Sequence, residues 1–200
     1  MKGFMLSLLL GVSSSTFGQA AEEYLKKGIL KDSLGDYQGA IADYSKAIEL
    51  NPKYESAYLC RGFAKGELKD NRGAIADYTK AIELDSENGY AYLNRGVEKK
   101  SIKDFHGAID DYTKAIELYP KYAVAYYNRG ITKDELKDFH GAIADFTKAI
   151  DIDAKYADAY YNRGISKIKL NDKNGACLDW RKAGELGFSN SYELIQKYCQ

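Results

Sequence analysis

Cysteine and histidine are the residues best suited to redox or metal chemistry, and this chain has three of the first and two of the second. Cys60, Cys177 and Cys199 form no CxxC pair, and His106 and His140 are 34 residues apart with no further ligand nearby. Because a structural zinc site needs four such ligands, we expect no metal site. The sequence also has no Gly-rich phosphate loop, HExxH motif or GxSxG nucleophile elbow. These absences predict a non-enzymatic protein with no catalytic residue, cofactor or metal.

The spacing of Cys177 and Cys199 leaves two interpretations open. Cys177 can serve as a small buried apolar group, because isoleucine stands at the corresponding position in four related segments of the chain. Cys199 follows 22 residues later, and in an oxidising compartment the two thiols can form a disulfide. A ring of this size stabilises a fold by about 3 kcal/mol in the loop-entropy model. Cys60 has no partner in either interpretation.

Composition and charge describe a soluble globular chain with no bias toward a charged partner. The chain has 200 residues, of which 45% are apolar and 29% are charged. Lysine plus arginine and aspartate plus glutamate each number 29, so the formal net charge is zero. This balance excludes a general electrostatic attraction to nucleic acid or to anionic lipid.

The first twenty residues have the layout of a secretory signal peptide. A short basic start is followed by an apolar run over residues 4–12 and by small polar residues over 13–20. The apolar run of nine residues is far shorter than the roughly 20 needed to span a bilayer, which disfavours a membrane anchor. We expect residues 1–20 to be removed near Gln19 or Ala20. The mature protein would then be exported, as a periplasmic or secreted bacterial protein.

The rest of the chain is a 34-residue pattern that occurs five times. Counted from Ala21, the repeats are residues 21–54, 55–88, 89–122, 123–156 and 157–190. Glycine stands at the eighth position of each: Gly28, Gly62, Gly96, Gly130 and Gly164. An aromatic residue stands at the twenty-fourth: Tyr44, Tyr78, Tyr112, Phe146 and Trp180. Alanine stands at the twentieth and twenty-seventh positions of every repeat. This agreement predicts five copies of one structural unit.

Each repeat has two amphipathic segments, which predict two helices. In the fourth repeat they cover residues 124–136 and 141–152. Aspartate recurs before the second segment, where a short acceptor side chain can cap a helix: Asp36, Asp70, Asp104, Asp138 and Asp172. Helices of this length are marginal alone in water, so neighbouring repeats must stack to bury enough surface.

The period and the residues at these offsets resemble the tetratricopeptide repeat family. The resemblance covers residues 21–190, and Pro52 and Pro120 stand at the family's late proline position. It implies an all-α fold, a right-handed superhelical α-α solenoid of five helix pairs. Residues 191–200 are expected to form a capping helix on the fifth repeat, with Ser191 as its N-cap.

Two positions of the first helix depart from the family by being basic in every repeat. The seventh position is Lys27, Arg61, Arg95, Arg129 and Arg163, and the eleventh is Lys31, Lys65, Lys99, Lys133 and Lys167. The twenty-third position is always acidic: Asp43, Asp77, Asp111, Asp145 and Asp179. Since the acids recur in step with the bases, we expect Arg–Asp pairs between packed helices. A basic stripe that binds an acidic ligand is the alternative.

The resemblance also implies that the first helix of each pair lines a concave groove. Three kinds of residue fall on the groove positions of the last three repeats: the amides Asn94, Asn128 and Asn162, the larger Leu93, Tyr127 and Tyr161, and the aliphatic Val97, Ile131 and Ile165. Amide side chains can donate to and accept from a peptide backbone, and their apolar neighbours can hold its side chains. Alternatively, the asparagines solvate the groove or bond to the next helix.

These observations favour a non-enzymatic protein–protein interaction scaffold that binds a peptide or protein segment in the groove. The alternative is a self-assembling structural or regulatory subunit of a cell-envelope complex, which is compatible with a homo-oligomer. We expect no nucleic-acid partner and no stable membrane span. The family's clamp for chaperone tails needs Lys and Asn where this chain has Leu and other aliphatic residues, so that ligand is disfavoured.

Overall fold

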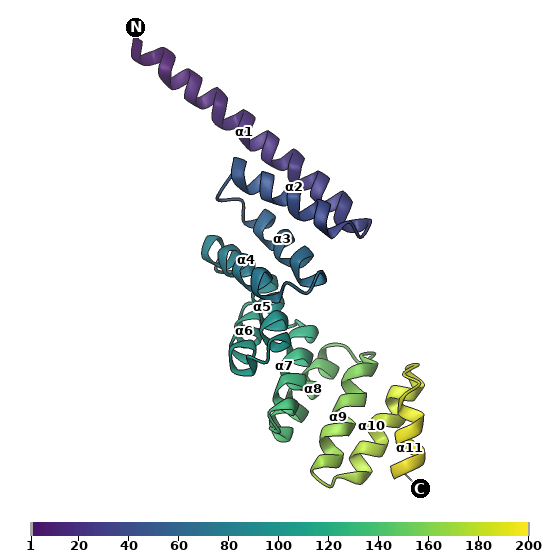
Figure 1. Cartoon of the computed structure of the whole chain (residues 1–200). Coiled ribbons are helices and arrows are strands. Elements are labelled where there is room, and N and C mark those ends of the chain that lie inside the picture. Colours follow the sequence, from purple (N-terminus) through teal and green to yellow (C-terminus); the bar gives the residue numbers. More distant parts are fainter. Residues whose placement is uncertain (1, 200) are drawn as a thin grey trace. The chain divides into compact units, whose positions relative to one another are not determined.

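A computed structural model describes the backbone of residues 2–199 and the side chains of residues 18–199. Within this part of the chain all regular structure is helical (Figure 1). The helices are α1 (Lys2–Ser33), α2 (Tyr37–Leu50), α3 (Glu55–Glu67), α4 (Asn71–Leu84), α5 (Gly89–Ser101), α6 (Phe105–Leu118), α7 (Ala123–Glu135), α8 (Phe139–Ile152), α9 (Ala157–Lys169), α10 (Lys173–Glu185) and α11 (Ser191–Tyr198). The predicted all-α fold is confirmed, although α7 and α8 begin one and two residues before the expected positions.

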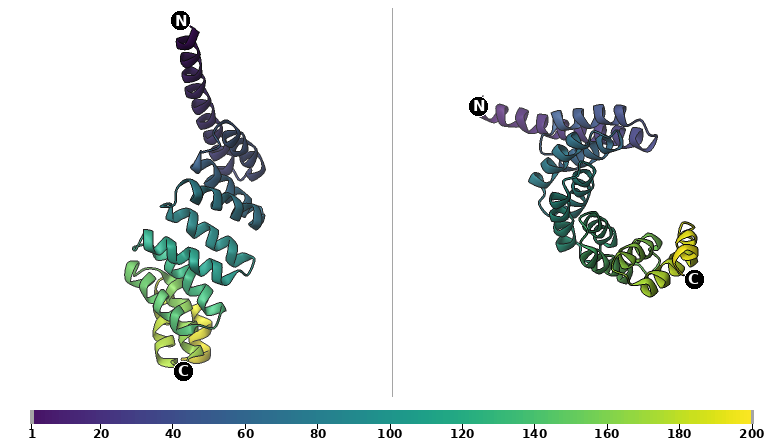
Figure 2. Two further views of the ribbon diagram at one scale, coloured as in Figure 1. Left: turned by 90° about the vertical axis from the view of Figure 1, so that its left-hand side faces the viewer. Right: turned by 60° about the horizontal axis from the view of Figure 1, so that its bottom comes forward.

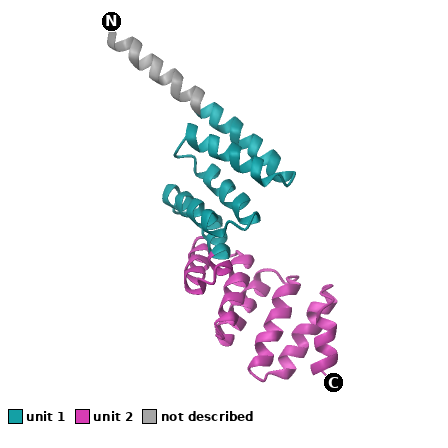
Figure 3. Ribbon diagram, viewed as in Figure 1, with its two compact units in different colours: residues 1–98 teal, residues 99–200 magenta. Residues whose placement is uncertain are grey.

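The chain divides into two compact units, Met1–Glu98 and Lys99–Gln200 (Figure 3). In unit 1, α1 packs on α2, α2 on α3 and α3 on α4. In unit 2, each helix from α6 to α11 packs on the next along the chain, as the two views of Figure 2 also show. Consecutive helix pairs therefore bury each other's apolar faces within each unit.

The predicted signal peptide falls mainly on residues whose side chains lie outside the described part, so it stays a prediction. Among the described residues, the helices lack the combination of length and apolar character that a bilayer span requires.

The core of a helix pair within one unit consists of one large aromatic ring surrounded by alanine and glycine. Phe146 on α8 is fully buried, as are Ala142 and Ala149 on either side of it. Burying a side chain of this size stabilises the fold by about 1.5–3 kcal/mol. The ring lies directly against Gly130 of α7, where an added Cβ would be 2.8 Å from Phe146 Cε1. In the first, second, fourth and fifth repeats, glycine at the eighth position thus makes room for the aromatic ring of the same repeat.

The recurring aspartates cap the second helices, as predicted. Asp138 Oδ1 accepts a hydrogen bond of 2.9 Å from the Gly141 backbone N–H, and the other four repeats have the same bond. The residue before each aspartate has a left-handed backbone, with Lys137 at φ 64° and Gly35 at φ 78°. This conformation ends the first helix and turns the chain toward the second.

A charged network joins three helices in unit 2. Arg129 of α7 donates two hydrogen bonds to Asp145 of α8, at 2.9 and 2.7 Å. Lys133 lies 2.7 Å from the same carboxylate. Arg129 also donates to Thr113 Oγ1 of α6 at 2.9 Å, and its guanidinium lies over the Tyr126 ring. The arginine therefore links its own repeat to the preceding one.

The same arrangement occurs around two other arginines. Arg61 contacts Asp77 and Ser45, and Arg163 contacts Asp179 and Thr147. The predicted Arg–Asp pairs are thus confirmed at three repeats, and these arginines do not form a free basic stripe. The first repeat differs, because Lys27 pairs with Glu23 of its own helix at 2.7 Å while Lys31 alone reaches Asp43.

The last helix closes the core of the fifth repeat. Ser191 is its first residue and is fully buried, and its hydroxyl donates to the Phe188 carbonyl at 2.7 Å. The expectation that Ser191 is the N-cap was wrong: the capping position is Asn190, which makes no side-chain cap. Because Gly184 of α10 lies close beneath it, the small serine packs inward rather than capping.

We expect Gly130→Ala to lower the free energy of unfolding by about 1–3 kcal/mol, because the new methyl overpacks the rigid Phe146 ring. Urea unfolding followed by circular dichroism measures this change. Gly66→Ala is the matched control, since its Cβ would meet only the flexible end of Glu98. Equal effects of the two substitutions would contradict the packing argument.

We expect Asp145→Asn to cost about 2–3 kcal/mol of stability. Removing one partner of a fully buried pair costs about 3–5 kcal/mol, and solvent contact of Arg129 and Lys133 reduces this. Asp151→Asn on the same helix is the control, because Asp151 is exposed and lies 4.0 Å from Lys148, so its loss should cost less than about 0.5 kcal/mol. The two variants are compared by urea unfolding, and a cost for Asp145→Asn as small as that of the control would refute a structural role for the network.

Candidate functional site

Six of the predicted groove residues lie on two first helices that contact each other in unit 2. Tyr127, Asn128 and Ile131 are on α7, and Tyr161, Asn162 and Ile165 are at the equivalent positions of α9. All six side chains are half-buried. We call the surface formed by these six residues the first-helix face. The remaining three, Leu93, Asn94 and Val97, lie on the part of α5 that belongs to unit 1, where Leu93 is buried and the other two are half-buried.

The two asparagines of the first-helix face use their N–H groups within the fold. Asn162 Nδ2 donates to the Asp158 carbonyl of its own helix at 2.9 Å and to the Tyr127 hydroxyl at 3.1 Å. Asn128 Nδ2 donates to the Val124 carbonyl at 2.9 Å. In the described part of the chain neither Oδ1 atom accepts a hydrogen bond. The asparagines therefore offer acceptors, and Asn162 also bonds to the neighbouring helix, as the alternative interpretation anticipated.

Tyr127 contributes a hydroxyl donor to this surface. Its ring packs on Tyr156 and Phe146, with centroid distances of 4.8 and 5.9 Å. Burial, with a smaller contribution from the charge of Asp158, raises the pKa of Tyr127 to about 12. The hydroxyl therefore stays protonated at neutral pH, and because it already accepts from Asn162, its own proton is free to be donated.

The charged side chains beside the first-helix face include both acidic and basic residues. Ser166 of α9 is buried and donates to Asp134 of α7 at 2.5 Å, a second bond between these helices. Burial lowers the pKa of Lys100, and the charge of Glu135 partly opposes that shift. This mixture does not select a ligand of one charge.

Sequence reasoning missed Tyr156 and the Ser166–Asp134 bond. The sequence does contain a pattern that could have indicated Tyr156. The last position of the repeat is tyrosine in three repeats, at Tyr54, Tyr122 and Tyr156. The second has no such signal, because the tenth position is Leu30, Ala64, Glu98, Thr132 and Ser166. Only the packing of α9 on α7 brings that hydroxyl to a carboxylate.

Unit 1 presents a more apolar and acidic first-helix surface. Ile29 of α1 and Phe63 of α3 are exposed on it. Burial raises the pKa of Asp32 and that of Glu98, and the charge of Glu67 adds to both shifts. Asn71 donates to Glu98 at 2.8 Å.

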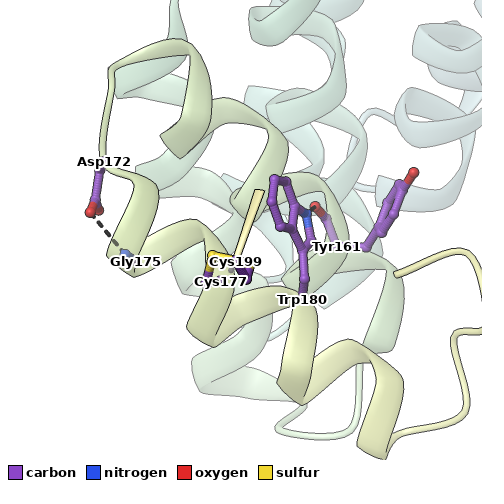
Figure 4. Close-up of a disulfide and its surroundings, with 6 residues drawn as sticks. All are labelled: Tyr161, Asp172, Gly175, Cys177, Trp180 and Cys199. Atoms are coloured by element: carbon purple, nitrogen blue, oxygen red, sulfur yellow. Dashed lines mark hydrogen bonds between the residues drawn. A yellow bond between two sulfur atoms is a disulfide. The ribbon is translucent and has the colours of Figure 1, made fainter. Parts of the chain in front are cut away.

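Cys177 and Cys199 form a disulfide between α10 and the residue after α11, with their Cα atoms 5.7 Å apart (Figure 4). In the same region the Trp180 indole N–H donates to the Tyr161 carbonyl at 3.1 Å. The core aromatic of α10 thereby holds the backbone of α9 at a residue of the first-helix face.

The two histidines and the third cysteine lie outside the first-helix face. His106 and His140 are exposed, and within the described residues no cluster of three or more His, Cys, Asp or Glu side chains is arranged to hold a metal ion. Cys60 of α3 is a free, half-buried thiol. Burial raises its pKa to about 11, and the charge of Asp32 adds to this.

Comparison with known families and structures identifies similar repeats along the chain. Family models described as TPR repeat match residues 33–69 and 135–171, and models described as tetratricopeptide repeat match residues 56–88, 89–122 and 111–144. Comparison with curated protein sequences finds no match.

Several solved structures share the fold. A crystal structure of MamA is 28% identical with a TM-score of 0.78, covering 90% of this chain and 96% of MamA. YrrB, whose structure is described as a TPR protein with an unusual peptide-binding site, is 23% identical with a TM-score of 0.75, covering 92% of this chain and 98% of YrrB. The first TPR of Spaghetti (RPAP3) bound to HSP90 peptide SRMEEVD is 26% identical with a TM-score of 0.59, covering 60% of this chain and 95% of that domain.

We expect Cys60 to react with iodoacetamide about 100-fold more slowly at neutral pH than an unhindered thiol, because its raised pKa leaves little thiolate. The rate should rise about tenfold per pH unit up to the pKa near 11. Mass spectrometry of alkylated protein measures the rate, and the same protein in urea is the control. Fast alkylation of the folded protein at neutral pH would contradict the burial of the thiol.

Proposed function

The chain belongs to the tetratricopeptide repeat family, and from this premise we propose that it is a non-enzymatic interaction scaffold. Its first-helix face, in the groove that the family forms, binds an extended peptide or protein segment. The observation that carries the proposal is the hydrogen bond from Asn162 to the Tyr127 hydroxyl. This bond joins the equivalent surfaces of α7 and α9, which are one repeat apart. It holds the asparagine Oδ1 acceptors and the Tyr127 hydroxyl donor in one place.

The polar atoms of the face match the backbone of a peptide. The Oδ1 atoms of Asn128 and Asn162 can accept N–H groups, and the Tyr127 hydroxyl can donate to a carbonyl. Every extended peptide offers both groups irrespective of its sequence. Because these side chains are held by contacts within the fold, they lose little conformational freedom on binding.

The apolar members of the face supply contacts for side chains of the ligand. Ile131, Ile165 and Tyr161 are half-buried, so each keeps surface available. The mixed charges around them favour a ligand without a strong net charge. Similarity to the Spaghetti (RPAP3) domain bound to HSP90 peptide SRMEEVD supports peptide binding by this fold. The residues of the family's chaperone-tail clamp are absent here, so we propose a different ligand.

We further propose that the protein acts after export, on the basis of the signal-like residues 1–20. Self-assembly as part of a cell-envelope complex is the second candidate. The exposed apolar side chains of Leu34 and Leu178, which lie outside the first-helix face, favour it.

The test uses peptides selected on the wild-type protein from a random phage-displayed library, with Kd measured by fluorescence anisotropy. We expect the double variant Tyr127→Phe and Asn128→Ala to weaken Kd about 30-fold, since each lost hydrogen bond is worth about 1 kcal/mol. Tyr127→Phe keeps the ring that packs on Phe146, and among the described residues Asn128 bonds only within its own helix, so the double variant should fold.

The control is His140→Ala on the exposed side of α8, which should leave Kd unchanged. Peptides that bind the double variant as tightly as the wild type would refute the site. Failure to select any peptide, together with concentration-dependent sedimentation that Leu178→Glu abolishes, would favour self-assembly instead.

A further inference from the structure

A surface pocket lies beside the disulfide of unit 2, along α10. Its volume is about 400 Å³, and it is lined by Lys173, Asn174, Cys177, Leu178, Arg181 and Cys199. Both half-cystines therefore border the same opening. Cys177 is only 7% exposed, whereas Cys199 is half-buried, so Cys199 is the more accessible residue of the pair.

The pocket is positively charged. Lys173 and Arg181 are both exposed, and neither pairs with a carboxylate in the part of the chain that the structure describes. On the same helix Lys182 is paired, at 3.1 Å from Glu185. Lys173 and Arg181 precede and follow Cys177 by four residues, so both lie on the helix face that carries the sulfur.

The other four repeats provide an internal reference for these positions. Where the fifth repeat has Lys173, they have Tyr37, Asn71, Phe105 and Phe139. Where it has Cys177, they have Ile41, Ile75, Ile109 and Ile143. Where it has Arg181, they have Ser45, Thr79, Thr113 and Thr147. The repeat pattern is therefore broken at the cysteine and at both cations that flank it.

From this arrangement we propose that the pocket is a site of thiol–disulfide exchange for an anionic thiol. The two cations attract the negatively charged thiol and stabilise the thiolate that leaves. Among the residues that the structure describes, no carboxylate pairs with either cation, so both can interact with the incoming group.

The exchange is a two-electron reduction by two thiols. A thiolate attacks Cys199 Sγ, a mixed disulfide forms, and the bond to Cys177 breaks with its electron pair leaving on the Cys177 sulfur. Between Lys173 and Arg181 this sulfur is stabilised as a thiolate. A second thiolate then attacks the mixed disulfide at the reagent's sulfur, which releases the Cys199 thiolate and the oxidised reagent as its disulfide. Each protein thiolate finally takes a proton from water.

Opening the disulfide releases the end of α11. A second contact between this end and α10 is that of Tyr198 with Trp180, whose ring centroids are 5.7 Å apart. A helix of eight residues is not stable alone in water. Reduction therefore uncovers the Trp180 ring, which is fully buried while α11 is in place.

The test measures the rate of disulfide opening by three small thiols at equal thiolate concentration: the anionic 2-mercaptoethanesulfonate, the neutral 2-mercaptoethanol and the cationic cysteamine. Samples of the full oxidised protein are quenched by alkylation, and mass spectrometry counts the labels on Cys177 and Cys199. At low salt we expect the anionic thiol to react about tenfold faster than the cationic one. Trp180 fluorescence should change at the same rate as α11 is released.

Two changes should remove this preference. High salt screens the cations, and the double variant Lys173→Gln and Arg181→Gln removes them, so the ratio of rates should fall toward one. Lys182→Gln is the matched control on the same helix and should keep the tenfold ratio. Equal rates for the three thiols in the wild type, or a preference that survives both changes, would overturn the proposal. The salt series uses only the wild type, so the test does not depend on the folding of any variant.

Discussion

The arrangement of these repeats depends on a carboxylate that is nearly excluded from water and shared by two cations. Asp145 is buried between α7 and α8, where Arg129 and Lys133 bind its two oxygens. A buried charge is tolerated only with well-placed partners, so the two helices have one favourable register. Arg129 also contacts Thr113 of the preceding repeat, so the position of α7 along α8 is linked to the position of α6. The buried aromatic and alanine core stabilises the fold through burial of apolar surface, while the network specifies how the helices align.

This alignment explains why residues far apart in the chain meet at the first-helix face. Asn162 and Tyr127 are 35 residues apart, yet they bond because α7 and α9 are each held in register with α8. Further along, Trp180 bonds to the backbone of Tyr161 and fixes α9 against α10. The disulfide then ties α11 over the same tryptophan. These contacts hold Tyr127, Asn162 and the backbone of Tyr161 in place, and side chains that are already held bind a flexible peptide at a lower entropic cost.

Some parts of the site could be predicted from the sequence and others could not. The asparagines, tyrosines and isoleucines recur at fixed offsets, so the periodicity of the helix places them on one face. Which atoms remain available to a ligand could not be predicted, because the bond of Asn162 to Tyr127 depends on the distance between two helices. The basic residues at the seventh position of the repeat were likewise predicted correctly in some repeats and not in others. Arg61, Arg129 and Arg163 pair with the aspartates as expected, whereas the shorter-reaching Lys27 pairs within its own helix.

The sequence alone determined the helical class, the 34-residue period, the aspartate caps and the membership of the repeat family, because each depends on contacts between residues close together in the chain. The tertiary structure decided which donors and acceptors stay free on Tyr127, Asn128 and Asn162. It also decided that Ser191 packs inward and that Lys173 and Arg181 flank an accessible disulfide. These features depend on distances between separate helices, and such distances are set by the packing of buried side chains rather than by any local pattern.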